Sequence, residues 1–149
     1  MAQEALFLSS LESMLALLQG KHQGLFFIEE QERQDKYAKA FALHEKAHYP
    51  EAEVIFIELC LIDPLQKSFW EGLASCWHRQ SLLDLAMQAW SLVGLFDCLD
   101  PRPYLQAAKC AFALQKKQEA QFFLALAQKK AKQDNVLQND IAFLKELLS

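Results

Sequence analysis

Alanine recurs at an interval of 34 residues in two series along this chain. The first series is Ala52, Ala86 and Ala120, and the second is Ala40, Ala74, Ala108 and Ala142. A unit of this length accommodates two helices and a turn, and stacked units of this kind bury one continuous core. Protein interiors are close-packed, so helices cross closely only where a small side chain leaves room. The two series therefore predict a stack of helix pairs with an alanine at each crossing.

The middle unit carries the fullest version of a known 34-residue pattern, that of the tetratricopeptide repeat. Its residues are Trp70, Leu73, Ala74 and Trp77, followed by Ala86 and Trp90. We expect an all-α tetratricopeptide-repeat solenoid with three helix pairs, an N-terminal helix and a C-terminal capping helix. The repeats are expected to occupy residues 34–131, with helices near 35–46 and 50–62 in the first unit. Residues 1–33 form the N-terminal region, and residues 132–149 form the cap.

Apolar helix faces mark both ends of the chain, outside the repeats. Leu6, Leu11, Leu15 and Leu18 recur at helical spacing within residues 3–19. Because an isolated solenoid offers no obvious place for this stripe, we expect it to form a homodimer contact. A second apolar face is expected to cover the C-terminal end of the core. Its residues are Ile141, Ala142, Leu144, Leu147 and Leu148.

Composition excludes several classes of function. The 149 residues are 52% hydrophobic and carry a net charge of −4, which argues against disorder and against a nucleic-acid binder. The N-terminus lacks the basic residues of an export signal, and no apolar stretch is long enough to span a bilayer, so we expect no direct membrane insertion. The four cysteines lack metal-ligand spacing, which indicates reduced thiols in a cytosolic protein.

The sequence contains no catalytic constellation. His44 and His48 have the i, i+4 spacing of a metal-binding pair, but they straddle a predicted helix end and no third ligand is near. A glycine-rich phosphate loop and a nucleophile elbow are both missing from the sequence. We therefore expect no metal, no cofactor and no enzymatic activity.

The first helix of each pair is expected to line the concave surface of the solenoid, where such folds bind other chains. The positions expected to face a ligand are Tyr37, Phe41, His44 and Glu45, then Glu71, Ser75, His78 and Arg79, then Leu105, Lys109, Phe112 and Ala113. Aromatic side chains offer a large contact area at low entropic cost, which favours binding of an extended peptide. The alternative is that Tyr37 and Phe41 pack against the N-terminal helix.

Four short motifs carry a family resemblance across residues 30–131. They are Tyr49-Pro-Glu-Ala52, Leu59-Cys60, Gly72-Leu73-Ala74-x-Cys76 and the lengthened turn Asp100-Pro101-Arg102-Pro103. In these motifs the chain resembles the translocator chaperones of type III secretion systems, also called class II chaperones. The resemblance implies a helical bacterial cytosolic protein that binds a disordered segment of a secreted translocator. It also implies homodimerisation through the N-terminal helical region.

The resemblance further implies a set of cargo-contacting residues, namely Tyr37, His44, Tyr49, Ile62, Leu73 and Trp90. His44 stands where that family usually has an aromatic residue, and Leu73 and Trp90 are also core positions of the repeat pattern. Together with the groove positions Phe41, Glu71, His78, Lys109 and Phe112, these residues form the predicted peptide-binding site. The leading hypothesis is a secretion chaperone that keeps its cargo soluble. The alternative is a repeat-type scaffold or structural component of the secretion apparatus.

Overall fold

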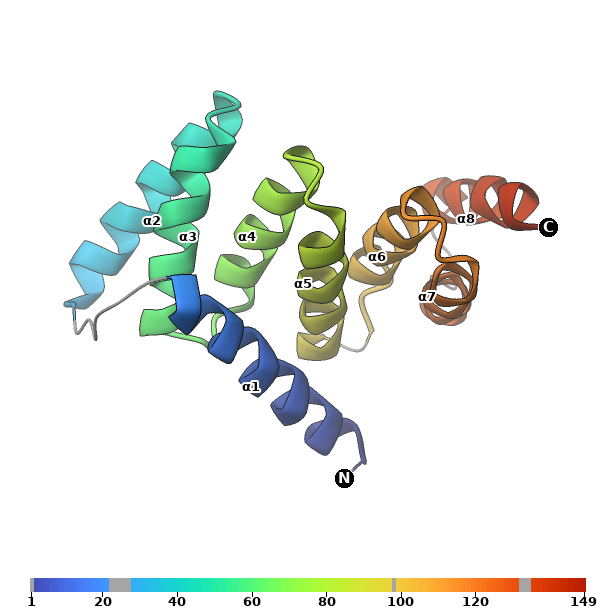
Figure 1. Ribbon diagram of the computed structural model, residues 1–149, viewed down its shortest axis with the longest axis horizontal. Coiled ribbons are helices and arrows are strands. Elements are labelled where there is room, and N and C mark those ends of the chain that lie inside the picture. Colours follow the sequence, from blue (N-terminus) through green and yellow to red (C-terminus); the bar gives the residue numbers. More distant parts are fainter. Residues whose placement is uncertain (1, 22–27, 98, 132–134) are drawn as a thin grey trace.

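A computed structural model describes residues 2–21, 28–97, 99–131 and 135–149, and over these residues the chain is helical with no β-strand (Figure 1). The helices are α1 (Ala2–Lys21), α2 (Glu30–Glu45), α3 (Tyr49–Ile62), α4 (Lys67–Arg79), α5 (Leu83–Phe96), α6 (Arg102–Ala113), α7 (Lys117–Lys130) and α8 (Asn135–Leu148). Three antiparallel pairs, α2–α3, α4–α5 and α6–α7, lie side by side in chain order, with α8 at the outer edge next to α7. The predicted all-α solenoid is confirmed.

Six alanines of the two series lie in the core of these pairs. Ala52, Ala86 and Ala120 are fully buried, and so in effect are Ala40, Ala74 and Ala108. The last member departs from the series, because Ala142 is exposed on α8. Helix α8 turns a face made of Ile141, Leu144 and Leu148 toward α6 and α7. It therefore covers the end of the core but does not repeat the packing of a fourth first helix, and Leu147 is exposed as well.

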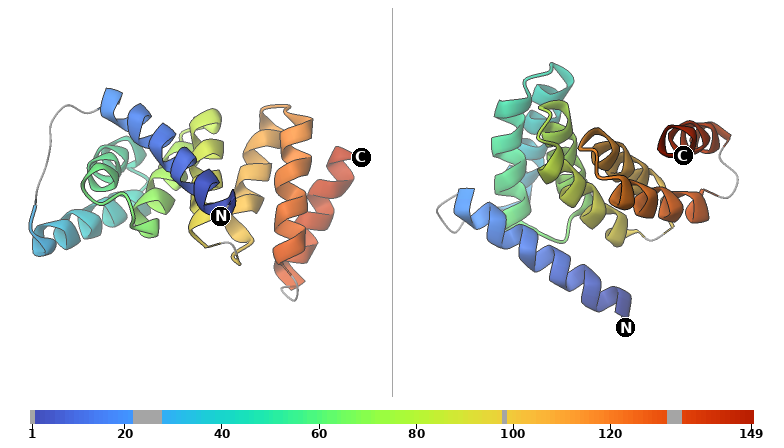
Figure 2. Two further views of the ribbon diagram at one scale, coloured as in Figure 1. Left: turned by 90° about the horizontal axis from the view of Figure 1, so that it is seen from below. Right: turned by 45° about the vertical axis from the view of Figure 1, so that its right-hand side comes forward.

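Helix α1 packs on the chain's own core, which corrects the expectation for its apolar stripe. Figure 2 shows α1 running across α3 and α5. Leu11 and Leu18 are buried in the same cluster as the core of the first two pairs, and Leu15 packs against that cluster. Because the side chains of Leu11 and Leu18 are already covered, they cannot contact a second copy in this arrangement, whereas Leu15 is half-buried. Only Leu6 of the predicted stripe stays exposed, at 56%.

The turn inside each pair has the same backbone conformation, although its residues differ. Ala47, Ser81 and Gln115 are 34 residues apart and have φ angles of 62°, 61° and 60°. In each turn the following residue donates its backbone N–H to a carbonyl five residues back, as from His48 to Leu43 at 2.8 Å. This is the Schellman arrangement, whose left-handed position usually holds glycine because other residues meet a steric penalty there.

Glycine at these three turns is expected to stabilise the fold. Each of Ala47→Gly, Ser81→Gly and Gln115→Gly removes a left-handed strain of about 1 kcal/mol, less the extra unfolded-state entropy of glycine. We expect a net gain of about 0.5 kcal/mol at each site, measured as a shift in the urea midpoint. Ala142→Gly, at an exposed position inside α8, is the control and should lose about 0.5–1 kcal/mol. A loss of stability at all three turns would contradict the backbone assignment.

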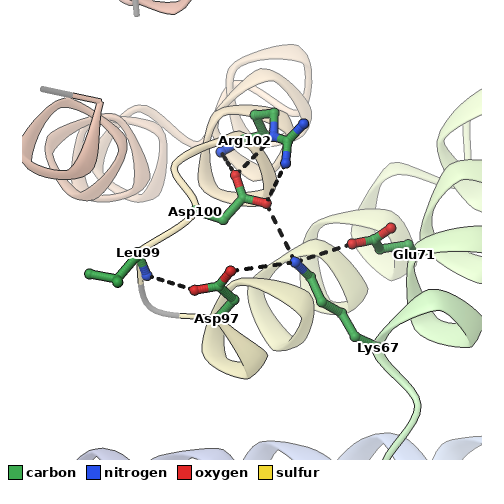
Figure 3. Close-up of polar contacts among 6 residues, drawn as sticks. All are labelled: Lys67, Glu71, Asp97, Leu99, Asp100 and Arg102. Carbon is green, nitrogen blue, oxygen red and sulfur yellow. Dashed lines mark hydrogen bonds and ion pairs between the residues drawn. The ribbon is translucent and has the colours of Figure 1, made fainter. Parts of the chain in front are cut away.

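An ionic junction connects the second and third pairs (Figure 3). The Lys67 ammonium at the start of α4 lies 3.4 Å from carboxylate oxygens of both Glu71 and Asp100, and 4.0 Å from Asp97. Asp100 in turn accepts hydrogen bonds from the backbone and guanidinium of Arg102 at 3.0 and 2.9 Å. Burial raises the pKa of Asp100, but the Arg102 hydrogen bonds and the charges of Arg102 and Lys67 outweigh it and lower the pKa. The Asp100 carboxyl group is thus ionised, and its contacts with Arg102 and Lys67 hold the lengthened Asp-Pro-Arg turn at the start of α6.

Candidate functional site

Helix α2 presents two aromatic rings with different roles. The ring of Tyr37 is half-buried and packs against Phe56 and Phe69, with ring centroids 6.1 and 5.6 Å apart. Phe41, one turn along, contacts Tyr37 at 6.4 Å and is 52% exposed. The rings that Tyr37 contacts therefore lie on α2, α3 and α4. Tyr37 packs α2 against α3 and α4, and Phe41 is the exposed ring that a ligand can contact.

His44 joins the surface of α2 to that of α4. Its Nε2 lies 2.7 Å from the hydroxyl oxygen of Ser75, and its ring meets Tyr49 edge-on at 5.1 Å. Burial lowers the pKa of His44, Glu45 partly offsets this, and Arg79 lowers it further. The imidazole is therefore neutral at neutral pH and acts as a hydrogen-bonding group. It takes the place of the aromatic residue that the family resemblance leads one to expect, and it still packs against Tyr49.

A pocket of about 580 Å³, here called the central pocket, lies between α4, α5 and α6. It is lined by Ser75, His78, Arg79, Trp90, Gln106 and Lys109. The indole Nε1 of Trp90 donates to Nδ1 of His78 at 3.3 Å, which fixes both rings on the pocket wall. Burial lowers the pKa of His78, and the charges of Lys109 and Arg79 lower it further. The central pocket is thus polar and positively charged around a neutral histidine.

The surface continues from α6 onto α8, a contribution that sequence analysis missed. Lys109 and Phe112 line a pocket of about 360 Å³ together with residues of α8, here called the terminal pocket. Its α8 residues are Asp140, Phe143, Leu144 and Leu147. Phe143 and Leu147 are 62% and 48% exposed. The signal was available in part, since apolar residues lie on more than one face of this helix.

Not every predicted site residue can contact a ligand. Leu73 is fully buried, so the cargo contact implied by the family resemblance is wrong for this residue, and its role is in the core. Leu105, expected to line the concave surface, is only 2% exposed and belongs to the core of the third pair. Ile62 is half-buried at the end of α3. Glu71 is held by Lys67 at the ionic junction.

The described residues form neither a metal-binding group nor a reactive thiol. No group of three or more His, Cys, Asp or Glu residues among them could hold a metal ion. Cys60, Cys76 and Cys110 are buried free thiols. Burial raises the pKa of all three, to about 12 for Cys76 and about 11 for Cys110, so they stay protonated and are poor nucleophiles. None of the helices in the described part of the chain is long and apolar enough to cross a membrane.

Comparison with known proteins gives one consistent result. Low calcium response locus protein H of Yersinia pestis is 32% identical over 92 residues, which is 62% of this chain and 55% of that protein. The chain therefore spans about half the length of the curated relatives it matches, and no protein-family model matches it. The Yersinia enterocolitica secretion chaperone SycD, solved with a peptide of the translocator YopD, superposes with a TM-score of 0.76 at 25% identity. That match covers 83% of this chain and 96% of SycD.

The chain has the fold of the translocator chaperone SycD and is similar to it in sequence. PcrH, solved with the chaperone binding region of PopD, agrees with a TM-score of 0.71 at 25% identity over 84% of this chain and 94% of PcrH. An alternative dimer of SycD matches with a TM-score of 0.74 at 25% identity, covering 83% of this chain and 96% of SycD. The resemblance expected from the motifs is confirmed. Phe41 lies on α2, the central pocket lies between α4, α5 and α6, and the terminal pocket lies between α6 and α8.

Proposed function

We propose that this protein is a type III secretion chaperone that holds an extended segment of a secreted translocator along α2, α4, α6 and α8. The observation that carries the proposal is a surface that continues across successive helix pairs. It starts at Phe41, passes through the His44–Ser75 contact into the central pocket, and reaches Phe112 at the terminal pocket. SycD and PcrH, which share this fold, were solved with translocator segments bound.

The chaperone works by binding alone. When an apolar segment of the cargo is covered, that segment can neither self-associate nor enter a membrane. The fraction of cargo that is bound follows mass action. No bond is made or broken, so the protein is not an enzyme. Its place of action is the bacterial cytoplasm, and a homodimer through the exposed part of α1, including Leu6, is part of the proposal. The scaffold alternative predicts no affinity for a translocator segment.

Removal of the Phe41 ring tests the binding surface. We expect Phe41→Ala to weaken binding of a translocator peptide by about 2 kcal/mol, the scale of an aromatic hot spot. The probes are peptides from YopD and from the chaperone binding region of PopD. Isothermal titration calorimetry measures the affinity, and circular dichroism checks folding. Phe41 is a better choice than Tyr37, because Tyr37 also supports Phe56 and Phe69.

Phe122→Ala provides the matched control. Phe122 is 61% exposed on α7, outside the proposed surface. We expect this variant to bind as the parent does. A folded Phe41→Ala variant with parental affinity for a peptide that the parent binds would exclude this surface as the cargo site. Absence of binding by the parent to every peptide would instead favour the scaffold alternative.

A further inference from the structure

The central pocket contains two cations without a counter-ion. Arg79 and Lys109 line it, and no lining residue is acidic. Within the described part of the chain, neither side chain has a carboxylate at ion-pair distance, and the acidic residue that shares a pocket with Lys109, Asp140, lies in the terminal pocket. Cations at other helix contacts are paired, as Lys36 is with Glu58 at 2.9 Å and Arg33 with Asp63 at 3.1 Å. In a protein of net charge −4, two unpaired cations around one pocket indicate an anionic ligand.

The other polar groups of the pocket are suited to a carboxylate. The Gln106 amide can donate hydrogen bonds, and the Ser75 hydroxyl can do so when Nε2 of His44 is the donor in their 2.7 Å contact. Ionised carboxylates only accept hydrogen bonds. His78 uses Nδ1 to accept from Trp90, so its remaining nitrogen, Nε2, carries the proton and is a donor in the neutral ring. Hydrogen bonds to an ionised acceptor are stronger than neutral ones. Two charges and several donors thus converge on the same space.

The surroundings of the pocket indicate where the carboxylate comes from. Apolar surface lies on both sides, with Phe41 beyond the His44–Ser75 contact on one side and Phe112 with Phe143 on the other. Lys109 lines the central and the terminal pocket, so the two are contiguous. A chain terminus bound here would leave one apolar side empty. A side chain within a longer segment would use both.

We propose that the central pocket binds the carboxylate of an aspartate or glutamate inside the cargo segment, between apolar anchors at Phe41 and at the terminal pocket. This inference rests on the proposed function and specifies its ligand. The recognised pattern is apolar, then acidic, then apolar, along an extended chain. Arg79 and Lys109 supply charge, and Gln106, Ser75 and His78 supply directed hydrogen bonds.

A guest-residue scan tests the acidic position. The tightest peptide from the panel described above is made with an acetylated N-terminus and an amidated C-terminus, so that it has no terminal carboxylate. Each position is replaced in turn by aspartate and by asparagine, which have nearly the same shape. We expect one position at which aspartate binds at least tenfold more tightly than asparagine. The double variant Arg79→Gln with Lys109→Gln should abolish that preference.

The control variant removes the same two charges elsewhere. Lys39→Gln with Lys129→Gln changes exposed residues of α2 and α7 outside both pockets, and it should keep the aspartate preference. A second readout is the pKa of His78 by NMR, which should be higher with the aspartate peptide bound than with the asparagine peptide. Equal affinity of the two peptides at every position would overturn the inference and leave the proposed function standing. So would a preference that survives in the Arg79–Lys109 variant.

A preference for a free C-terminal carboxylate over the amidated peptide would also overturn it, by assigning the pocket to a chain terminus. If the parent binds no peptide of the panel, both the proposed function and this inference fail. The two failures are therefore distinguishable by whether the parent binds at all.

Discussion

Replacing Leu18 with alanine is expected to lower the free energy of unfolding by about 2–5 kcal/mol, the range measured for truncation of a buried leucine. Leu18 is fully buried although it lies on α1, outside the repeats. It shares a core cluster with Phe56 and Trp70 of the first two pairs. Urea denaturation followed by circular dichroism measures the change. An unchanged midpoint would mean that α1 does not pack on the repeats.

Leu6→Ala is the matched control on the same helix. Leu6 is 56% exposed, so the substitution should change the stability of the folded protein by less than about 0.5 kcal/mol. It also tests the proposed dimer, because an exposed leucine at a dimer contact matters only for association. Light scattering should show a lower average mass for Leu6→Ala than for the parent. If the parent is already monomeric, α1 serves only its own domain.

Gly94→Ala is expected to destabilise the protein by about 1–3 kcal/mol through overpacking, even though alanine favours a helix interior by about 1 kcal/mol. A β-carbon at Gly94 would lie 2.6 Å from the ring of Tyr104. That ring is 4% exposed, so the residues packed around it limit its movement. Gly72→Ala should behave in the same way, because its β-carbon would overlap the buried ring of Phe56. Differential scanning calorimetry measures both changes.

Gly20→Ala is the control of opposite sign. A β-carbon at Gly20, in the last turn of α1, meets no atom within 4 Å. Only helix propensity is left to act there, so we expect a gain of up to about 1 kcal/mol. Stabilisation by alanine at Gly94 or Gly72 would show that the neighbouring ring can move.

Much of the fold could be predicted because it depends on spacing. The alanine series fixed the helix pairs, and six of the seven alanines lie in the core. The prediction that Ala142 is buried was wrong, because the repeat period alone does not specify how α8 is rotated about its axis. The stripe on α1 was correctly assigned to a helix face, but a periodic face does not identify its partner. The left-handed turns escaped detection because Ala47, Ser81 and Gln115 share a backbone conformation and not a residue type.

The candidate site was predictable to a lesser extent. Phe41, His78 and Lys109 followed from their positions in the repeat, and all three have exposed or pocket-lining side chains. The expected contact of Leu73 with cargo was not found, because motif similarity does not distinguish a residue that contacts a ligand from one that packs in the core. The contribution of α8 was missed because its apolar residues were all assigned to one capping face. Two faces are in use, one against α6 and α7 and one beside Phe112.

The position of α1 makes the two ends of the helix array differ in how firmly they are attached. In a solenoid whose units touch only their neighbours, either terminal unit can detach at the cost of one interface. Here α1 packs on both α3 and α5, so the first pair is held by two connections and not one. Most buried residues of the third pair and α8 form a second cluster, and among the described helices only α5 packs extensively on that pair from the rest of the chain. Fraying therefore begins at the C-terminal end, which is the end where the terminal pocket lies.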